Sequence, residues 1–165
     1  MNSTYIWLPL EISGTDVTMP WLVNWLPTTF ENGPSETNYD GYEASLSNGA
    51  KLVSCSGCVD SNAAGYLGGP SDGAATFNNI YSSTTTETTI RIYFENGDQT
   101  QRFADISVNG GTPQRVAFLP SANAYTPAKS VFTAQLNEGS VNTIVVSGYN
   151  ASYAADIDYM AVPIY

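Results

Sequence analysis

The sequence predicts an all-β protein built as a sandwich of two antiparallel sheets. Two features predict this fold class. Short apolar or β-branched runs recur at intervals of about 10 residues, as the strands of a sandwich do. Clusters rich in Gly and Asn, which tolerate the backbone angles of tight reversals, separate these runs. No segment carries the apolar period of a helix.

The expected strands follow one another from residue 42 onward. They are Tyr42–Ser45, Thr89–Phe94, Asp105–Val108, Arg115–Leu119, Ser130–Leu136, Asn142–Ser147 and Asp156–Val162. In the second of these, Ile90, Ile92 and Phe94 share one face, which should therefore belong to the core. Turns are expected at Glu95–Asp98, Asn109–Gly111 and Asn137–Ser140. The hydroxyl-rich stretch 81–89 is expected to be a loop that leads into a strand.

The first forty residues differ from the rest. They hold all three tryptophans, at positions 7, 21 and 25, and residues 27–40 read as a linker. Because exposed tryptophans promote aggregation, this segment should pack on the sandwich or form the end of a neighbouring domain. We therefore expect a tail or linker over residues 1–40 and one β-sandwich domain over residues 41–165.

The charge balance disfavours several partners. Five basic residues against fifteen acidic ones give a net charge of -10, which repels nucleic acid and anionic membrane surfaces. Without histidine, no Ser-His-Asp or Cys-His relay can form. The low charged content and the abundance of neutral polar residues are typical of secreted proteins, and sequons begin at Asn2 and Asn150. We expect a secreted protein whose signal is not part of this chain.

Acidic residues near the two ends of the domain admit several interpretations. If the first and last strands are neighbours, Glu43 and Asp158 with backbone carbonyls would suit calcium, although both acids could equally be solvated. Asp156 and Asp158 would share a strand face with Cα atoms roughly 6.6 Å apart. Paired carboxylates at such separations hydrolyse glycosides, but the sequence indicates no deep cleft around them.

The loop that precedes the last strand has the composition of a sugar site. Tyrosine offers an apolar platform, and Asn or Asp offers hydrogen bonds to hydroxyls; Tyr149, Asn150, Tyr153 and Asp156 supply both. The alternative is that the tyrosines only cap the core. The spacing of Cys55 and Cys58 occurs in redox sites, zinc knuckles and short disulfides, and the chain lacks the helical context or further ligands that the first two need.

An ordered series of motifs resembles the family 35 carbohydrate-binding modules in their fungal form. The series is Tyr42–Ala44, Gly49–Ala50, Cys55–Cys58, Gly65–Gly69, Arg102, Ile106–Gly111, Leu136–Gly139, Asn142–Ile144 and Asp156–Asp158. The resemblance implies a jelly-roll-like sandwich with a structural calcium ion near the N-terminal strand. Glu43 and Asp158 match the family's acids, whereas Ser45 replaces a second one, which leaves calcium binding open.

The resemblance also implies a sugar site in the loops at one end of the sandwich. The ligand-binding residues expected there are Tyr66, Gly97, Asp98, Arg102, Tyr149, Asn150, Tyr153 and Asp156. No catalytic residue is expected. Under the same resemblance, Cys55 and Cys58 should form a disulfide that holds the loop leading into Gly65–Gly69.

The leading segment, with Tyr5–Leu10, Trp21 and Trp25, resembles the end of a family 43 glycoside hydrolase catalytic domain. Enzymes that join the two families are typically exo-β-1,3-galactanases. The combination implies a non-catalytic module that binds galactose or β-1,3-galactan and holds an attached hydrolase near its substrate. A module for uronic acid-bearing xylan or pectin that uses calcium, and a small carboxylate glycosidase, are the alternatives.

Overall fold

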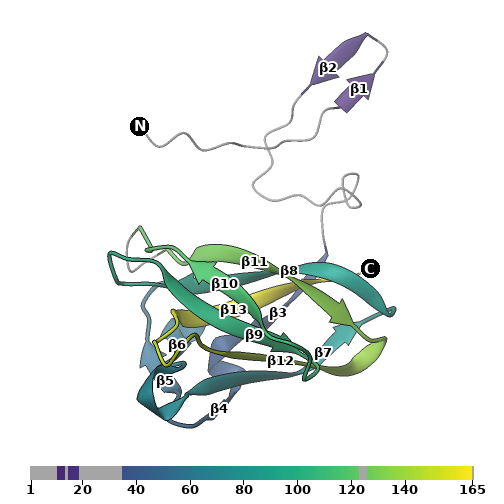
Figure 1. Cartoon of the computed structure of the whole chain (residues 1–165). Coiled ribbons are helices and arrows are strands. Elements are labelled where there is room, and N and C mark those ends of the chain that lie inside the picture. Colours follow the sequence, from purple (N-terminus) through teal and green to yellow (C-terminus); the bar gives the residue numbers. More distant parts are fainter. Residues whose placement is uncertain (1–10, 14, 19–34, 123–125, 165) are drawn as a thin grey trace. The chain divides into compact units, whose positions relative to one another are not determined.

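The computed structural model describes residues 11–13, 15–18, 35–122 and 126–164, and the chain forms two compact units, Met1–Ser35 and Glu36–Tyr165 (Figure 1). In the first unit, strand β1 (Glu11–Ser13) pairs antiparallel with β2 (Asp16–Thr18). The leading segments with the three tryptophans, which resemble the end of a hydrolase domain, lie outside the described residues.

The second unit is a sandwich of two antiparallel sheets, which confirms the predicted fold class. One sheet has the order β10-β9-β12-β7-β4, and the other has the order β11-β8-β13-β6-β5, with β3 also paired to β13. The strands are β3 (Glu36–Asp40), β4 (Ser45–Ser47), β5 (Lys51–Ser54), β6 (Asn62–Gly65), β7 (Ala74–Ser82), β8 (Thr86–Glu95), β9 (Arg102–Val108), β10 (Gln114–Phe118), β11 (Ala128–Leu136), β12 (Gly139–Gly148) and β13 (Asp156–Pro163).

Helical structure in the described ranges is limited to three single 3-10 turns. They are η1 (Gly41–Glu43), η2 (Val59–Ser61) and η3 (Gly69–Ser71). Among these residues no helix has the length and apolar character that crossing a membrane requires.

The core lies between the two sheets and follows the period of two along each strand. Ile90, Ile92 and Phe94 of β8 are buried, as their alternation predicts, while residues between them are partly exposed. Ile144 and Val146 of β12 face them from the other sheet. Phe94 and Phe118, one from each sheet, pack with their ring centroids 4.5 Å apart, which closes the core at the end where β8 and β10 finish.

The structure corrects the expected first strand. Tyr42–Ser45 is not a strand: η1 occupies Gly41–Glu43, and Ser45 begins β4. The N-terminal strand that pairs with β13 is instead β3, which lies within the stretch expected to be linker, so the sandwich begins at Glu36. Gly41 explains the turn, because a Cβ at that position would collide with the backbone of Ile157.

The stretch 81–89 is also more regular than expected. Strand β7 runs to Ser82 and β8 begins at Thr86, so a short turn of three residues joins them. The hydroxyl groups contribute to this connection between the two sheets, since Ser82 Oγ donates a hydrogen bond of 2.7 Å to the carbonyl of Thr84. The Ser/Thr composition therefore belongs to two strand ends and the turn between them.

Candidate functional site

Two loops meet at one end of the sandwich. The register pairs Asp156 with Glu95 and Gly148 with Ala104, so the loop from β8 to β9 and the loop from β12 to β13 emerge side by side. Arg102 joins them, because its Nη1 donates a hydrogen bond of 2.9 Å to the carbonyl of Ala154. The end of β6 lies next to both, since Ala64 pairs with Ile157.

One hollow at this end, which we call the tyrosine cleft, has a volume of about 440 Å³. It is lined by Asp98, Thr100, Gln101, Arg102, Phe103, Tyr149, Ser152 and Tyr153. Arg102 Nε donates a hydrogen bond of 2.8 Å to Asp98 Oδ2. That hydrogen bond and the positive charge of Arg102 lower the pKa of Asp98, so Asp98 is a charged acceptor beside a fixed guanidinium group.

The tyrosines around this cleft differ in what they can offer. Tyr149 is occupied on one side, because the Arg115 guanidinium lies 3.3 Å from its ring centroid and Phe103 contacts its edge. Tyr153 and Tyr66 are 44% and 45% exposed and meet edge to face, with their centroids 5.9 Å apart. The Lys51 ammonium lies 4.1 Å from the ring centroid of Tyr66. Tyr153 is therefore the exposed ring best placed to stack on a ligand, and Tyr66 and Tyr149 help to frame the cleft.

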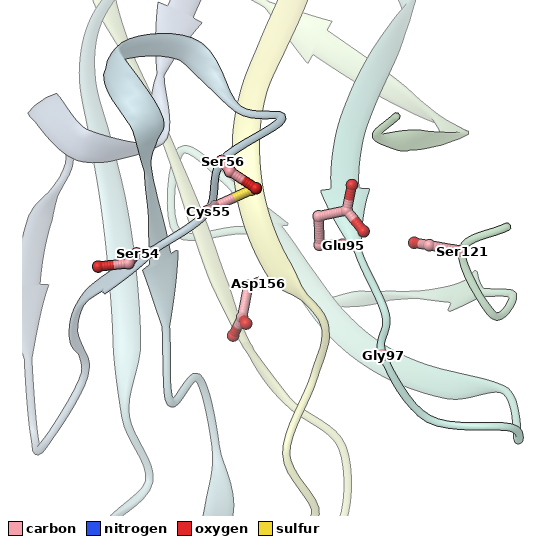
Figure 2. A pocket seen from close by; sticks show the side chains of 7 residues that line it. All are labelled: Ser54, Cys55, Ser56, Glu95, Gly97, Ser121 and Asp156. Carbon is pink, nitrogen blue, oxygen red and sulfur yellow. The ribbon is translucent and has the colours of Figure 1, made fainter. Parts of the chain in front are cut away.

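A second hollow, which we call the carboxylate cleft, has a volume of about 420 Å³ (Figure 2). Its lining residues are Ser54, Cys55, Ser56, Glu95, Gly97, Ser121 and Asp156. The strand-borne acids Glu95 and Asp156 lie between the loop that carries Cys55 and the segment that carries Ser121 (Figure 2). Cys55 is joined to Cys58 by a disulfide with the Cα atoms 5.3 Å apart, and the pair packs on Ala63. The disulfide thus stabilises one wall of this cleft.

Both acids in the carboxylate cleft hold protons more strongly than usual. Burial raises the pKa of Asp156; the charge of Arg102 opposes this rise and that of Glu95 adds to it. Burial also raises the pKa of Glu95, and a hydrogen bond with Ser121 opposes the rise. Glu95 Oε1 is buried and has no hydrogen-bond partner.

The structure distributes the expected ligand-binding residues over the two clefts. Asp98, Arg102, Tyr149 and Tyr153 line the tyrosine cleft, and Gly97 and Asp156 line the carboxylate cleft. Tyr66 borders the site through its contact with Tyr153. Asn150 is exposed at a turn with a left-handed φ of 49° and is not among the lining residues of either cleft.

Sequence reasoning missed Glu95, Phe103 and Ser121. Glu95 had one available signal, because it directly follows the predicted strand Thr89–Phe94 and begins a predicted turn, where a side chain is free to face a loop site. Ser121 had none: it is brought to the site by the hydrogen bond of 2.8 Å that its hydroxyl accepts from the backbone N–H of Asn96.

Asp158 and Glu43, the acids expected to bind calcium, differ in their surroundings. Asp158 is buried, its Oδ1 accepts a hydrogen bond of 2.8 Å from the backbone N–H of Val59, and burial raises its pKa. Glu43 is exposed on η1. Within the described ranges no three carboxylate, thiolate or imidazole side chains converge on one point, so these side chains alone do not form a calcium site.

Asp156 and Asp158, the acids of the paired-carboxylate alternative, lie in different surroundings. The alternation of β13 is interrupted by a register shift between Ile157 and Tyr159, and Asp158 lies in the interruption. Asp156 therefore lines the carboxylate cleft, whereas Asp158 is buried against Val59. The two acids therefore differ in exposure, because Asp156 lines an open cleft and Asp158 is buried.

Comparisons with known proteins agree with this fold. No family model and no curated protein sequence matches the chain. An exo-β-1,3-galactanase from Phanerochaete chrysosporium, solved with β-1,3-galactotriose, is similar at 30% identity and a TM-score of 0.74; the match covers 95% of this chain and 36% of the galactanase chain. A family 35 carbohydrate-binding module from Clostridium thermocellum is similar at 26% identity and a TM-score of 0.71, with 77% of this chain and 98% of the module covered.

These similarities define the class to which the fold belongs. The sandwich has the fold of the family 35 carbohydrate-binding modules. A module of this family from Cellvibrio japonicus, at 21% identity and a TM-score of 0.63, supports the fold alone. The chain spans about a third of the length of the galactanase that it resembles.

Proposed function

We propose that this chain is a non-catalytic carbohydrate-binding module that binds galactose-containing polysaccharide, in particular β-1,3-galactan, and that it is attached to a glycoside hydrolase. The observation that carries the proposal is the tyrosine cleft, in which an exposed ring lies beside a fixed charged pair. A sugar presents an apolar C–H face and a rim of hydroxyls. The ring of Tyr153 can stack on the apolar face, and Arg102 and Asp98 can form hydrogen bonds with the hydroxyls.

Arg102 is the central polar group of the proposed site. Two of its N–H groups are committed, one to Asp98 and one to the carbonyl of Ala154, which fixes the guanidinium plane. Its remaining N–H groups can donate to sugar oxygens, while Asp98 accepts from sugar hydroxyls. Hydrogen bonds to charged groups of this kind give orientation as well as affinity.

The expected affinity is modest. One stacking ring and a few hydrogen bonds at an open cleft correspond to a dissociation constant on the order of micromolar to millimolar. Such a module is useful when it is joined to an enzyme, because the linkage raises the concentration of the enzyme at its substrate.

Two findings support galactan and an attached hydrolase. The galactanase in the comparison was solved with β-1,3-galactotriose. Its match covers 95% of this chain, whereas those to the isolated modules cover 75% to 78%. The galactanase similarity therefore extends beyond the sandwich into residues that precede it. The disulfide is compatible with a secreted protein, which we also propose.

Calorimetric titration with β-1,3-galactobiose and galactan tests the proposal. We expect Tyr153→Ala to weaken binding by about tenfold or more, because the stacking surface is lost. Tyr81→Ala is the matched control: Tyr81 is 46% exposed but lines neither cleft, so its removal should leave affinity unchanged. Absence of heat with every galactoside, or an equal loss in both variants, would refute the assignment.

Catalysis and calcium are tested in the same preparations. We expect no release of reducing sugar from galactan by the pure chain, and release would establish a glycosidase instead.

The proposed calcium ion would have to bind Asp158 and Glu43 together with carbonyl and water oxygens. A higher unfolding temperature in calcium than in EDTA, lost in Asp158→Asn, is the expected result; equal temperatures would dismiss the ion.

A further inference from the structure

Glu95 and Asp156 are direct partners across adjacent antiparallel strands. The register of β8 and β13 places them opposite one another, so their side chains leave the same face of the sheet. Cross-strand partners have Cβ atoms about 4.5 to 5.5 Å apart, and like charges in this arrangement are destabilising. A fold has no structural need for two acids at such a pair.

The surroundings do not neutralise this pair. Arg102 acts on Asp156 electrostatically, but its hydrogen bonds go to Asp98 and to the carbonyl of Ala154. The other polar side chains that line the cleft are Ser54, Ser56 and Ser121, which carry no charge. The carboxylate cleft is therefore rich in hydrogen-bond acceptors and has a negative electrostatic potential.

One atom in the cleft lacks the partner that burial normally demands. Glu95 Oε1 is shielded from solvent and accepts no hydrogen bond within the chain. Buried polar atoms are nearly always paired, and the side chain of Glu95 lines the carboxylate cleft, so a rotation of its carboxylate would present this acceptor to a donor from outside the chain. A sugar hydroxyl is such a donor.

We propose that Glu95 and Asp156 act together as the specificity-determining pair of the sugar site, accepting hydrogen bonds from the hydroxyls of neutral sugars and rejecting sugars that carry a carboxylate. This inference rests on the proposed function and names the class of ligand within it. The discrimination has two sources. Charge-assisted hydrogen bonds favour the neutral ligand, and repulsion between like charges at an interface disfavours the acidic one.

The two clefts form neighbouring parts of one site. Gly97 lines the carboxylate cleft and Asp98, the next residue, lines the tyrosine cleft, so only the loop between β8 and β9 separates them. A ligand longer than one sugar can therefore contact Tyr153 and the acid pair together. A carboxylate on the residue next to the stacked sugar would then lie close to both acids.

The test compares two disaccharides that differ only in charge: β-1,3-galactobiose and its analogue oxidised at C6 of one residue to a uronic acid. We expect the unaltered protein to bind the neutral ligand at least about tenfold more tightly. Glu95→Gln and Asp156→Asn should each reduce this preference several-fold. Glu87→Gln is the control, because Glu87 is exposed on the same strand and lines neither cleft.

Salt provides a second readout, measured on the unaltered protein and on a double variant that carries both Glu95→Gln and Asp156→Asn. Raising the ionic strength screens repulsion, so the preference of the unaltered protein should shrink in high salt and that of the double variant should change little. Unfolding temperatures confirm that the variants fold, and loss of one like charge should not lower them.

The outcomes separate the inference from the function on which it rests. If neither disaccharide binds to the unaltered protein, the proposed function fails. If the neutral ligand binds but both single variants keep the full preference, the acid pair does not select the ligand and the inference is overturned. A preference for the acidic ligand that EDTA abolishes would also overturn it, because a cation would then bridge the acids.

Discussion

Tyr153 owes its position to a glycine beneath its ring. Gly69 has a left-handed φ of 68°, and a Cβ added to it would overlap the ring of Tyr153. The backbone N–H of Gly69 also donates a hydrogen bond of 3.2 Å to the carbonyl of Ser152. The exposed ring of the proposed platform is thus held from below by backbone atoms, which fixes its direction without covering its outer surface.

Gly69→Ala should therefore weaken galactan binding, by about tenfold, as the displaced ring loses its stacking geometry. Gly110→Ala is a close control, since Gly110 has a φ of 71° but nothing within 4 Å of the added Cβ. Both variants should be destabilised by about 1 kcal/mol, because alanine disfavours the left-handed backbone conformation. Only Gly69→Ala should also lose affinity for galactan. Titration calorimetry and urea unfolding measure the two effects; equal affinities in the two variants would remove Tyr153 from the site.

Glu95 should make stability depend on pH in a defined direction. Burial is the main cause of its raised pKa, so between the ordinary value of 4.5 and the raised value the folded chain binds more protons than the unfolded chain. Stability from this group therefore falls as pH rises through that interval. Glu95→Gln removes the effect: its unfolding temperature relative to the unaltered protein should increase from pH 4 to pH 7. A constant difference over this range would contradict the assigned burial of the charge.

At the scale of elements, the loop from β8 to β9 is organised by one buried side chain. Asn96 Nδ2 donates hydrogen bonds of 3.0 and 2.9 Å to the carbonyls of Thr100 and Phe118, and its Oδ1 accepts one of 3.1 Å from the backbone N–H of Asp98. Asn96 is fully buried. It therefore sets the path of the segment that presents Gly97 to one cleft and Asp98 to the other.

Asn96→Ala is expected to destabilise the fold by about 3 kcal/mol, because several buried backbone groups lose their partner, and to weaken ligand binding as the loop relaxes. Asn142 offers the comparison: it is equally buried, and its Nδ2 donates to the carbonyls of Ile80 and Asn137, away from both clefts. Asn142→Ala should cost similar stability and leave affinity intact once corrected for the folded fraction. Equal loss of affinity in both variants would show that Asn96 acts only through global stability.

The strands that a single sequence could predict are those with large alternating side chains. Strand β8 is expected over Thr89–Phe94 and extends three residues further at its start and one further at its end. Strand β6, with the sequence Asn-Ala-Ala-Gly, gave no such signal, because its residues are buried by close approach of the chain and not by their size. Strand β3 was read as linker, since it is polar and depends on distant partners: Glu36 pairs with Arg91, and the Tyr39 hydroxyl accepts a hydrogen bond from the backbone of Tyr81.

The candidate site was predictable to the level of loops. The resemblance indicated the segments that contain Asp98, Arg102 and Tyr153, and the structure brings these three to one cleft. The division into two clefts could not be predicted, because it depends on the hydrogen bonds of Asn96. The different surroundings of Asp156, which lines a cleft, and Asp158, which is buried at a register shift, likewise could not be predicted from spacing along the sequence.

At the scale of the whole molecule, the sandwich serves as a rigid support for one ligand-binding end. A densely packed core runs to Phe94 and Phe118, directly before the residues that line the clefts. Rigid elements hold binding loops in place, so little ordering should accompany ligand binding. This arrangement suits the proposed function, in which the module keeps an attached enzyme on a polysaccharide.

The central claim is that a galactan chain binds at the end of the sandwich where Tyr153 and Arg102 meet. A crystal structure of the complete chain with β-1,3-galactotriose tests it most directly. We predict a galactose ring stacked on Tyr153, with hydroxyls within hydrogen-bond distance of Arg102 and Asp98. A trisaccharide bound on another face of the sandwich, with the tyrosine cleft left open at saturating ligand, would contradict the account.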